Sequence, residues 1–106
     1  MRHLSEEKLR AYQQFFGTLT TQNRLRIINE LRHGPLSVQE LSQKTGIEQS
    51  AVSHNLKRLK HCGFVTVQQQ GKQRIYALNS KTISKLMDII DEHMKKHCIK
   101  IVRGER

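Results

Sequence analysis

Residues 37–64 read SVQELSQKTGIEQSAVSHNLKRLKHCGF, and this stretch decides the fold. Ser37 is followed three residues later by Glu40, which is the spacing of a capping box, in which each side chain bonds the other residue's backbone N–H at the start of a helix. The pattern predicts a short helix from about 38 to 45. Gly46 then interrupts this helix, because glycine suits the left-handed conformation in which many helices end.

A second helix is predicted from about 48 to 61. Its apolar residues recur at helical spacing and should form its buried side (Val52, Leu56 and Leu59). Gly63 ends this helix. Two short helices joined at a glycine are typical of a helix-turn-helix unit, here over about residues 37–62.

After Gly63 the pattern changes from that of a helix to that of a strand. β-Branched and aromatic runs at 64–67 and 75–78 flank the polar, basic segment 68–74. A hairpin wing is therefore predicted over about residues 64–78. Gly71 should lie at its turn, because glycine tolerates the positive φ that a tight turn requires.

Helices are also predicted on both sides of this unit. Ser5, followed by two acidic residues, predicts the start of an amphipathic helix over about 5–17. Another helix begins near Thr21 and ends at Gly34, with apolar side chains on one face (Leu25, Ile28 and Leu31). A last helix is predicted over about 80–98. The predicted fold class is mainly α with a β-hairpin wing, a winged helix-turn-helix in which four helices precede the hairpin and one follows it.

Length and composition exclude several classes of protein. The 106 residues have room for one domain, taken here as 1–106, and no apolar run approaches the roughly 18 residues of a membrane span. No phosphate-binding glycine loop, metalloprotease helix or nucleophile elbow occurs, so we expect no enzyme. Cys62 and Cys98 lie far apart and form no CxxC pair, which favours the reducing cytoplasm.

Basic residues dominate the chain and are unevenly placed. Lys and Arg number 19 against 9 Asp and Glu, which gives a net charge of +10. No acidic residue lies between Glu48 and Asp88, whereas that stretch holds Lys57, Arg58, Lys60, Lys72, Arg74, Lys81 and Lys85. Solubilising surfaces usually mix both signs of charge. The acid-free block therefore favours a polyanionic partner, with double-stranded DNA first and an anionic membrane second.

The outward face of the 48–61 helix has side chains suited to a duplex. Short polar groups near its start can reach base edges, and longer cations further along can reach phosphates. We expect this DNA-binding face to comprise Gln49, Ser50, Ser53, His54, Lys57 and Arg58. An ordinary polar helix face is the alternative interpretation. Lys72 and Arg74 near the hairpin tip are expected to reach the minor groove or the backbone, although they could also keep an edge strand from pairing with other chains.

The sequence resembles the ArsR/SmtB family of winged-helix repressors. The resemblance rests on residues 19–28, 36–41, 49–59 and 63–78, and the run Val52-Ser53-His54 followed by Leu56 is its most specific part. It implies a homodimeric repressor that dimerises through its first and last helices and reads a palindromic operator with the 48–61 helix. The expected dimer residues are Leu9, Tyr12, Ile83, Leu86, Ile90 and Met94.

The apolar face of the last helix supports a dimer independently, since such a face needs a partner once the small core is filled. A sequence-indifferent DNA-coating protein is the alternative function, because the same charge would serve it. It would bind all duplexes alike.

The resemblance also raises the question of an inducer, because family members often release DNA when a metal or an oxidant binds. Several of the family's ligand positions are filled by other residue types here (Ser37, Gln39, Ser80 and Thr82). A different cluster of His93, His97 and Cys98 includes the i, i+4 histidine spacing that suits zinc or another transition metal. The alternative is a pair of surface histidines near a chain end that frays from about Ile99. No other cofactor is expected to be required. Cys62 is expected to be a small buried side chain that only fills space in the core.

Overall fold

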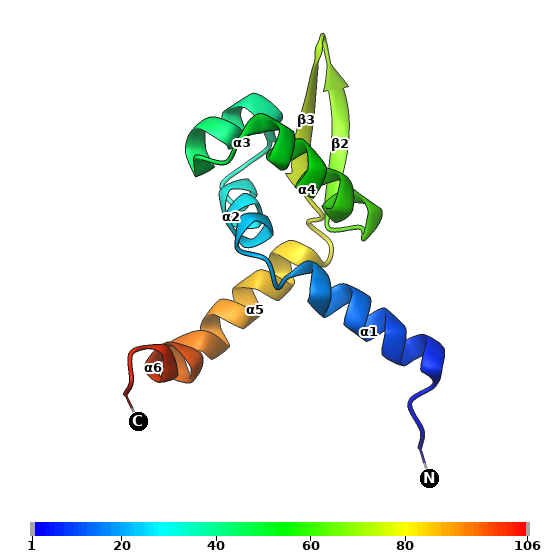
Figure 1. The fold of residues 1–106 in the computed structure, drawn as a ribbon, viewed down its shortest axis with the longest axis vertical. Coiled ribbons are helices and arrows are strands. Elements are labelled where there is room, and N and C mark those ends of the chain that lie inside the picture. Colours follow the sequence, from blue (N-terminus) through cyan, green and yellow to red (C-terminus); the bar gives the residue numbers. More distant parts are fainter. Residues whose placement is uncertain (1, 106) are drawn as a thin grey trace.

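A computed structural model describes residues 2–105 of the chain. The elements follow in the order α1 (Glu6–Thr18), α2 (Gln22–Leu31), β1 (Leu36–Ser37), α3 (Val38–Thr45), α4 (Gln49–His61), β2 (Val65–Gln70), β3 (Gln73–Leu78), α5 (Ile83–Lys96) and α6 (Cys98–Val102). Figure 1 shows the hairpin of β2 and β3 standing beside the pair α3 and α4. This arrangement confirms the predicted winged helix-turn-helix.

The signals that begin and end α3 and α4 are those predicted from the sequence. The Ser37 side chain accepts a hydrogen bond from the Glu40 backbone N–H at 3.2 Å, and the Glu40 carboxylate accepts one from the Ser37 N–H at 3.0 Å. These hydrogen bonds to Ser37 lower the pKa of Glu40. Gly46 and Gly63 each have a φ of 75°, the left-handed conformation in which a helix can end and the chain can turn.

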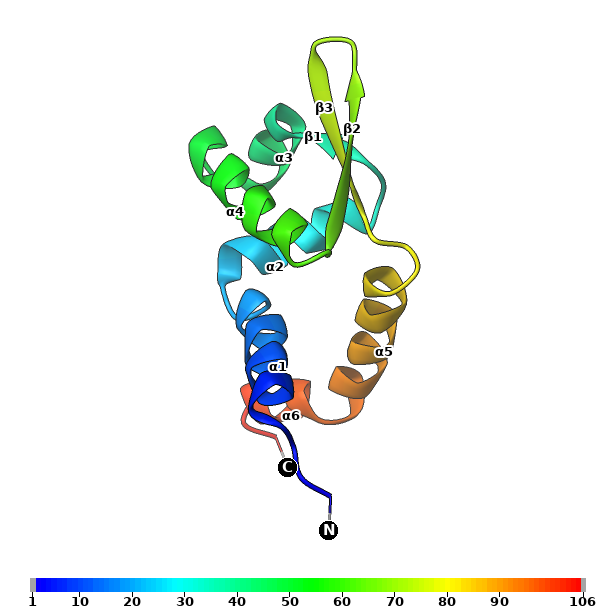
Figure 2. The same ribbon diagram turned by 90° about the vertical axis from the view of Figure 1, so that its right-hand side faces the viewer.

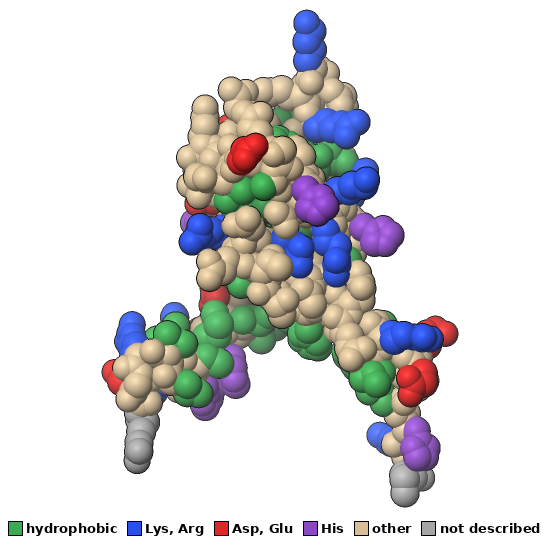
Figure 3. Space-filling model, in the orientation of Figure 1, with side chains coloured by type: hydrophobic (Ala, Val, Ile, Leu, Met, Phe, Trp, Pro, Cys, Tyr) green, Lys and Arg blue, Asp and Glu red, His purple; other side chains and the backbone are tan. Residues whose placement is uncertain are grey.

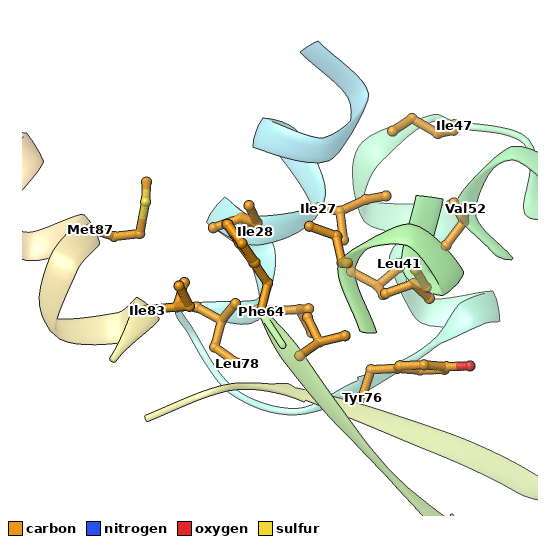
Figure 4. Close-up of a cluster of buried hydrophobic side chains, with 14 residues drawn as sticks. Ile27, Ile28, Leu41, Ile47, Val52, Phe64, Tyr76, Leu78, Ile83 and Met87 are labelled. Atoms are coloured by element: carbon orange, nitrogen blue, oxygen red, sulfur yellow. The ribbon is translucent and has the colours of Figure 1, made fainter. Parts of the chain in front are cut away.

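The core lies where α2, α3 and α4 pack against one another and against the sheet (Figure 4). Its least exposed hydrophobic side chains are Ile27, Ile28, Leu41, Val52, Leu56, Leu59 and Phe64. The buried face of α2 differs from the prediction, because Ile27 is fully buried whereas Leu25 is 41% exposed. Residues two apart in a helix point to nearly opposite sides, so only one of this pair can face the core.

The hairpin occupies nearly the predicted residues, but its two strands are longer than predicted, and its sheet has a third strand. β2 and β3 pair from Val65 opposite Leu78 as far as Gln70 opposite Gln73, so most of the expected loop is strand. Gly71, with a φ of 62°, lies in the short turn. β1, which was not predicted, adds two residues to the other edge of β3, with Leu36 opposite Tyr76.

Three details of the flanking helices also differ from the predictions. The first helix was predicted to end at about residue 17, whereas Gly17 lies inside α1, which continues for one more residue. The last helix was predicted from about residue 80, whereas α5 begins at Ile83, and its N-cap residue Thr82 makes no side-chain cap. The predicted frayed tail from about Ile99 is instead the short helix α6.

The helices α1 and α5, here called the arms, extend away from the remainder of the fold, the body of residues 22–78. Figure 1 and Figure 2 show them leaving its lower side in different directions. The Cα radius of gyration is 15.8 Å, against about 13 Å for a compact chain of this length. The arms therefore expose surface that a compact fold would bury.

Candidate nucleic-acid interface

The helix α4 buries its apolar side, together with the polar residue Asn55, and exposes most of its other polar residues. Val52, Leu56 and Leu59 are fully buried. The predicted contact residues Gln49, Ser50, Ser53, His54 and Lys57 are exposed, and Arg58 is half-buried. Ser50 donates a hydrogen bond to the Glu48 carboxylate at 3.0 Å. Because the buried side fixes the rotation of α4, its polar side faces outward in one defined orientation.

A cationic hollow lies beside α4 on the side of α2. Its volume is about 680 Å³, and every residue that lines it is basic: Arg24, His54, Lys57, Arg58, Lys60 and His61. The Nε atom of Arg58 is buried and has no hydrogen-bond partner among the described residues. The basic side chains that line the hollow concentrate positive charge there, which suits an anionic group. Blue and purple side chains gather on this face in Figure 3.

A second hollow, of about 500 Å³, lies between α4 and the wing. It is lined by Ser53, Lys57 and Lys60 of α4 and by Arg74 of β3, with Val38, Leu56 and Tyr76 at its apolar wall. Lys57 and Lys60 thus border both hollows. The structure brings Arg74 together with the predicted residues of α4, whereas Lys72 lies at the turn of the hairpin, away from them.

The cations of this surface have no acidic partners in the described part of the chain. Ion pairs within residues 2–105 join Arg32 to Asp88 and Asp91, and Lys95 to Glu92. None of them includes a cation of α4 or the wing. The surface therefore keeps its positive charge available for a polyanion.

The predicted DNA-binding face left out three residues of the cationic hollow, namely Arg24, Lys60 and His61, although Lys60 was counted in the acid-free block. Lys60 and His61 follow Lys57 by three and four residues, so helical spacing could have placed them on the same face. No sequence signal identifies Arg24. It is fixed by tertiary contacts, in which it donates to the Thr18 carbonyl at 2.6 Å and to the Asn55 side chain at 3.4 Å.

The arms form a second, apolar surface. A groove of about 510 Å³ lies between them and is lined by Lys8, Ala11, Tyr12, Phe15, Phe16, Leu86 and Ile90. Tyr12 is 46% and Phe16 58% exposed. Figure 3 shows hydrophobic side chains along the underside of the molecule between the arms. Three of the predicted dimer residues, Tyr12, Leu86 and Ile90, thus line one groove.

The other predicted dimer residues lie in different surroundings. Leu9 is 38% exposed and Met94 is half-buried. Ile83 is only 4% exposed and belongs to the core, so its assignment to a dimer surface was wrong. The first turn of α5 packs against the body, and the Ile83 side chain lies in that contact.

The predicted cluster of His93, His97 and Cys98 does not form a complete metal site. The rings of His93 and His97 lie 4.6 Å apart between centroids. No group of three or more His, Cys, Asp or Glu side chains within residues 2–105 is arranged to hold a metal ion. Helical spacing brings the two histidines together, but Cys98 begins α6, after the chain changes direction at His97.

Cys62, at the end of α4, is half-buried between α4 and α1. Its sulfur lies 3.3 Å from the Thr18 hydroxyl and accepts a hydrogen bond from the Gln14 amide at 3.5 Å. Burial opposes ionisation of the thiol, but hydrogen bonds with Thr18, Gln14 and Arg58 outweigh it and lower the pKa of Cys62. Cys62 is therefore a polar link between two helices rather than a simple filler.

No helix within residues 2–105 has both the length and the apolar character needed to cross a membrane.

Solved structures similar to this chain share its fold. One is M. tuberculosis Rv0081, with a TM-score of 0.84 and 28% identity over 92% of this chain and 99% of that one. Another is described as the homodimeric winged helix-turn-helix DNA-binding domain Mb0332 from Mycobacterium bovis, with a TM-score of 0.74 and 26% identity over 92% of this chain and 96% of that one.

Sequence comparison gives the family. Residues 21–67 match the family described as "Bacterial regulatory protein, arsR family". The transcriptional regulator NmtR of Mycobacterium tuberculosis is 41% identical over 66% of this chain, a match that spans 58% of NmtR. The arsenical resistance operon repressor of Bacillus subtilis is 33% identical over 82% of this chain and 84% of its own length. The chain therefore belongs to the arsR family of bacterial regulatory proteins.

Proposed function

We propose that the chain is a homodimeric, sequence-specific DNA-binding repressor that reads a palindromic operator with α4. The observation that carries this proposal is the surface of α4 itself. One side of the helix is fully buried, and the other presents short polar groups followed by cations that have no acidic partners within residues 2–105. A helix fixed in this way can enter a major groove without reorganising.

The first two turns of α4 supply the contacts to bases. Gln49, Ser53 and His54 are exposed there and offer donors and acceptors of short reach. The hydroxyl hydrogen of Ser50 is directed to Glu48, so Ser50 is better placed to accept a hydrogen bond from a base than to donate one.

The later turns of α4 and the wing supply the contacts to phosphates. Lys57 and Lys60 border both hollows, and Arg58 lines one of them. Arg74 reaches the same surface from β3, and Lys72 extends it to the hairpin tip. Such contacts fix the register of a protein on the duplex and provide most of its sequence-independent affinity.

The arms supply the dimer contact. An apolar groove lined by exposed aromatic side chains favours a second copy of the chain, because monomers rarely expose such surface. The description of Mb0332 as homodimeric supports this choice. In the dimer, two α4 helices about 34 Å apart would meet successive major grooves of one operator.

One titration tests the proposal against the coating alternative. The purified protein is titrated by fluorescence anisotropy on the DNA upstream of its own gene and on a shuffled duplex of equal length. A repressor should prefer its operator by about a thousandfold at physiological salt. Equal affinity for both duplexes would favour a sequence-indifferent coating protein.

The same titration, repeated with added zinc, arsenite or oxidant, tests for an inducer. The Bacillus subtilis relative is named for arsenical resistance, which makes metals and metalloids the first class to add. Sedimentation of the same samples separates loss of DNA binding from loss of the dimer.

A bacterial DNA-binding regulator would act in the cytoplasm.

A further inference from the structure

The arm α5 is attached to the body mainly at its beginning. Ile83 and Met87, one turn apart, are 4% and 9% exposed and belong to the core. Ile90, one turn after Met87, is only half-buried and packs at the edge of the core, and no described residue of α5 beyond it belongs to the core or packs against it. Apolar burial is non-directional, so these side chains hold the first two turns of α5 in place but set the direction of the remaining helix only weakly.

A second, directional contact lies just beyond this anchor. Arg32, the C-cap residue of α2, donates from one Nη atom to Asp88 at 2.8 Å and from the other to Asp91 at 2.7 Å. The two carboxylates are three residues apart and so share one face of α5. The Arg32 side chain is 21% exposed, and its pKa is raised by its hydrogen bonds to Asp91 and Asp88. Within residues 2–105, these are the ion pairs that join two different elements.

We propose that Arg32 is a positioning residue that sets the angle between α5 and the body, and thereby the separation of the two α4 helices. The inference about α4 separation rests on the proposed homodimer, whereas the inference about the angle does not. A planar guanidinium bound to two carboxylates of α5 resists rotation of that helix relative to α2. Non-directional apolar contacts do not resist such a rotation in the same way.

A small change of this angle matters on the scale of DNA. The 14 residues of α5 span about 21 Å at 1.5 Å per residue, so a rotation of about 10° at its start moves its far end by roughly 4 Å. Adjacent base pairs are separated by about 3.4 Å along the duplex axis. The paired contact of the Arg32 guanidinium with Asp88 and Asp91, here called the fork, therefore helps to determine which spacing between operator half-sites the dimer accepts.

A distance measurement within one chain tests the angle directly. Spin labels are placed at Gln69→Cys in the wing and Lys95→Cys on α5, in a background of Cys62→Ser and Cys98→Ser. The labelled chain is mixed with excess unlabelled protein, so that only distances within a chain are recorded. Arg32→Gln should make the distance distribution at least about twofold broader, because loss of a partly exposed ion pair loosens the helix without unfolding the chain.

Two further variants of the labelled chain give this measurement its controls. Arg26→Gln removes an exposed arginine from the same helix and should leave the distribution unchanged. Arg32→Lys keeps the charge without the fork and should give an intermediate width. A distribution for Arg32→Gln equal to that for Arg26→Gln would overturn the positioning role.

The effect on DNA is measured with operators that differ by one base pair at their centre. The parent protein should lose about tenfold or more in affinity on the altered operators, as it would for a mismatched base pair. Arg32→Gln should discriminate among them by less than about threefold while its dimer remains intact by sedimentation. Unchanged discrimination would refute the link to half-site spacing, and a monomeric parent protein would refute the proposed homodimer without touching the distance result.

Discussion

Replacing Lys60 with glutamine should flatten the salt dependence of DNA binding. Five cations of each subunit lie on the proposed surface (Lys57, Arg58, Lys60, Lys72 and Arg74). A homodimer would then neutralise about ten phosphates, which predicts a slope near −9 for the logarithm of the binding constant against that of salt concentration. Because the dimer loses two contacts in Lys60→Gln, the slope should change to about −7.

The difference is large enough to measure by fluorescence anisotropy with a labelled duplex across a series of KCl concentrations. Doubling the salt should weaken the parent protein roughly 500-fold and the variant roughly 150-fold. The flattening should appear on operator and shuffled DNA alike, because a phosphate contact carries no direct sequence information.

Lys95→Gln provides the matched control. Lys95 lies on α5, is 75% exposed and approaches Glu92 only to 4.0 Å, so its loss changes the net charge by the same amount at a distance from the proposed surface. Its slope should equal that of the parent protein. The reasoning fails if Lys60→Gln keeps the parent slope, or if Lys95→Gln flattens the slope equally, since the effect would then belong to net charge and not to a phosphate contact.

Two other expectations concern the same surfaces, and a third concerns the N-terminal cap of α3. Ser53→Ala should reduce operator preference by about 1–3 kcal/mol at the base it contacts, with binding to shuffled DNA unchanged, as compared by competition anisotropy. Leu86→Glu should give monomers by sedimentation and much weaker operator binding, because it places a charge in the apolar groove between the arms. Glu40 has a pKa lowered in the folded state, so its stabilising effect should be complete above the ordinary value of 4.5 and be lost as pH falls through the folded-state pKa. Thermal unfolding between neutral and acidic pH should therefore show a smaller acid loss in Glu40→Gln, and an identical loss would contradict this role.

The helix-turn-helix could be predicted from the sequence because its boundaries depend on residues close together in the chain. Ser37 and Glu40 cap α3 through contacts three residues apart, and Gly46 and Gly63 act through their own backbone conformation. The outward face of α4 followed in the same way from the spacing of Val52, Leu56 and Leu59.

Features that depend on tertiary packing could not be predicted. The apolar face of α5 is divided between the core and the groove, and the sequence alone does not show that Ile83 belongs to the first and Leu86 to the second. β1 is too short for a strand signal and exists because β3 pairs with it from far along the chain. Arg24 lines the cationic hollow because it is held by contacts with α1 and α4, and no local sequence pattern predicts these contacts.

The exposed aromatic rings of the arms have a consequence for the life of a newly made subunit. In the proposed homodimer a second copy covers Tyr12 and Phe16. Until it does so, the chain exposes apolar surface to water, and its folded state lacks the extra stability that association would provide. Subunits that remain single at low abundance should be cleared by proteases sooner than assembled ones. Turnover of the protein should then slow as its own concentration rises, so that its cellular level depends more than proportionally on its rate of synthesis.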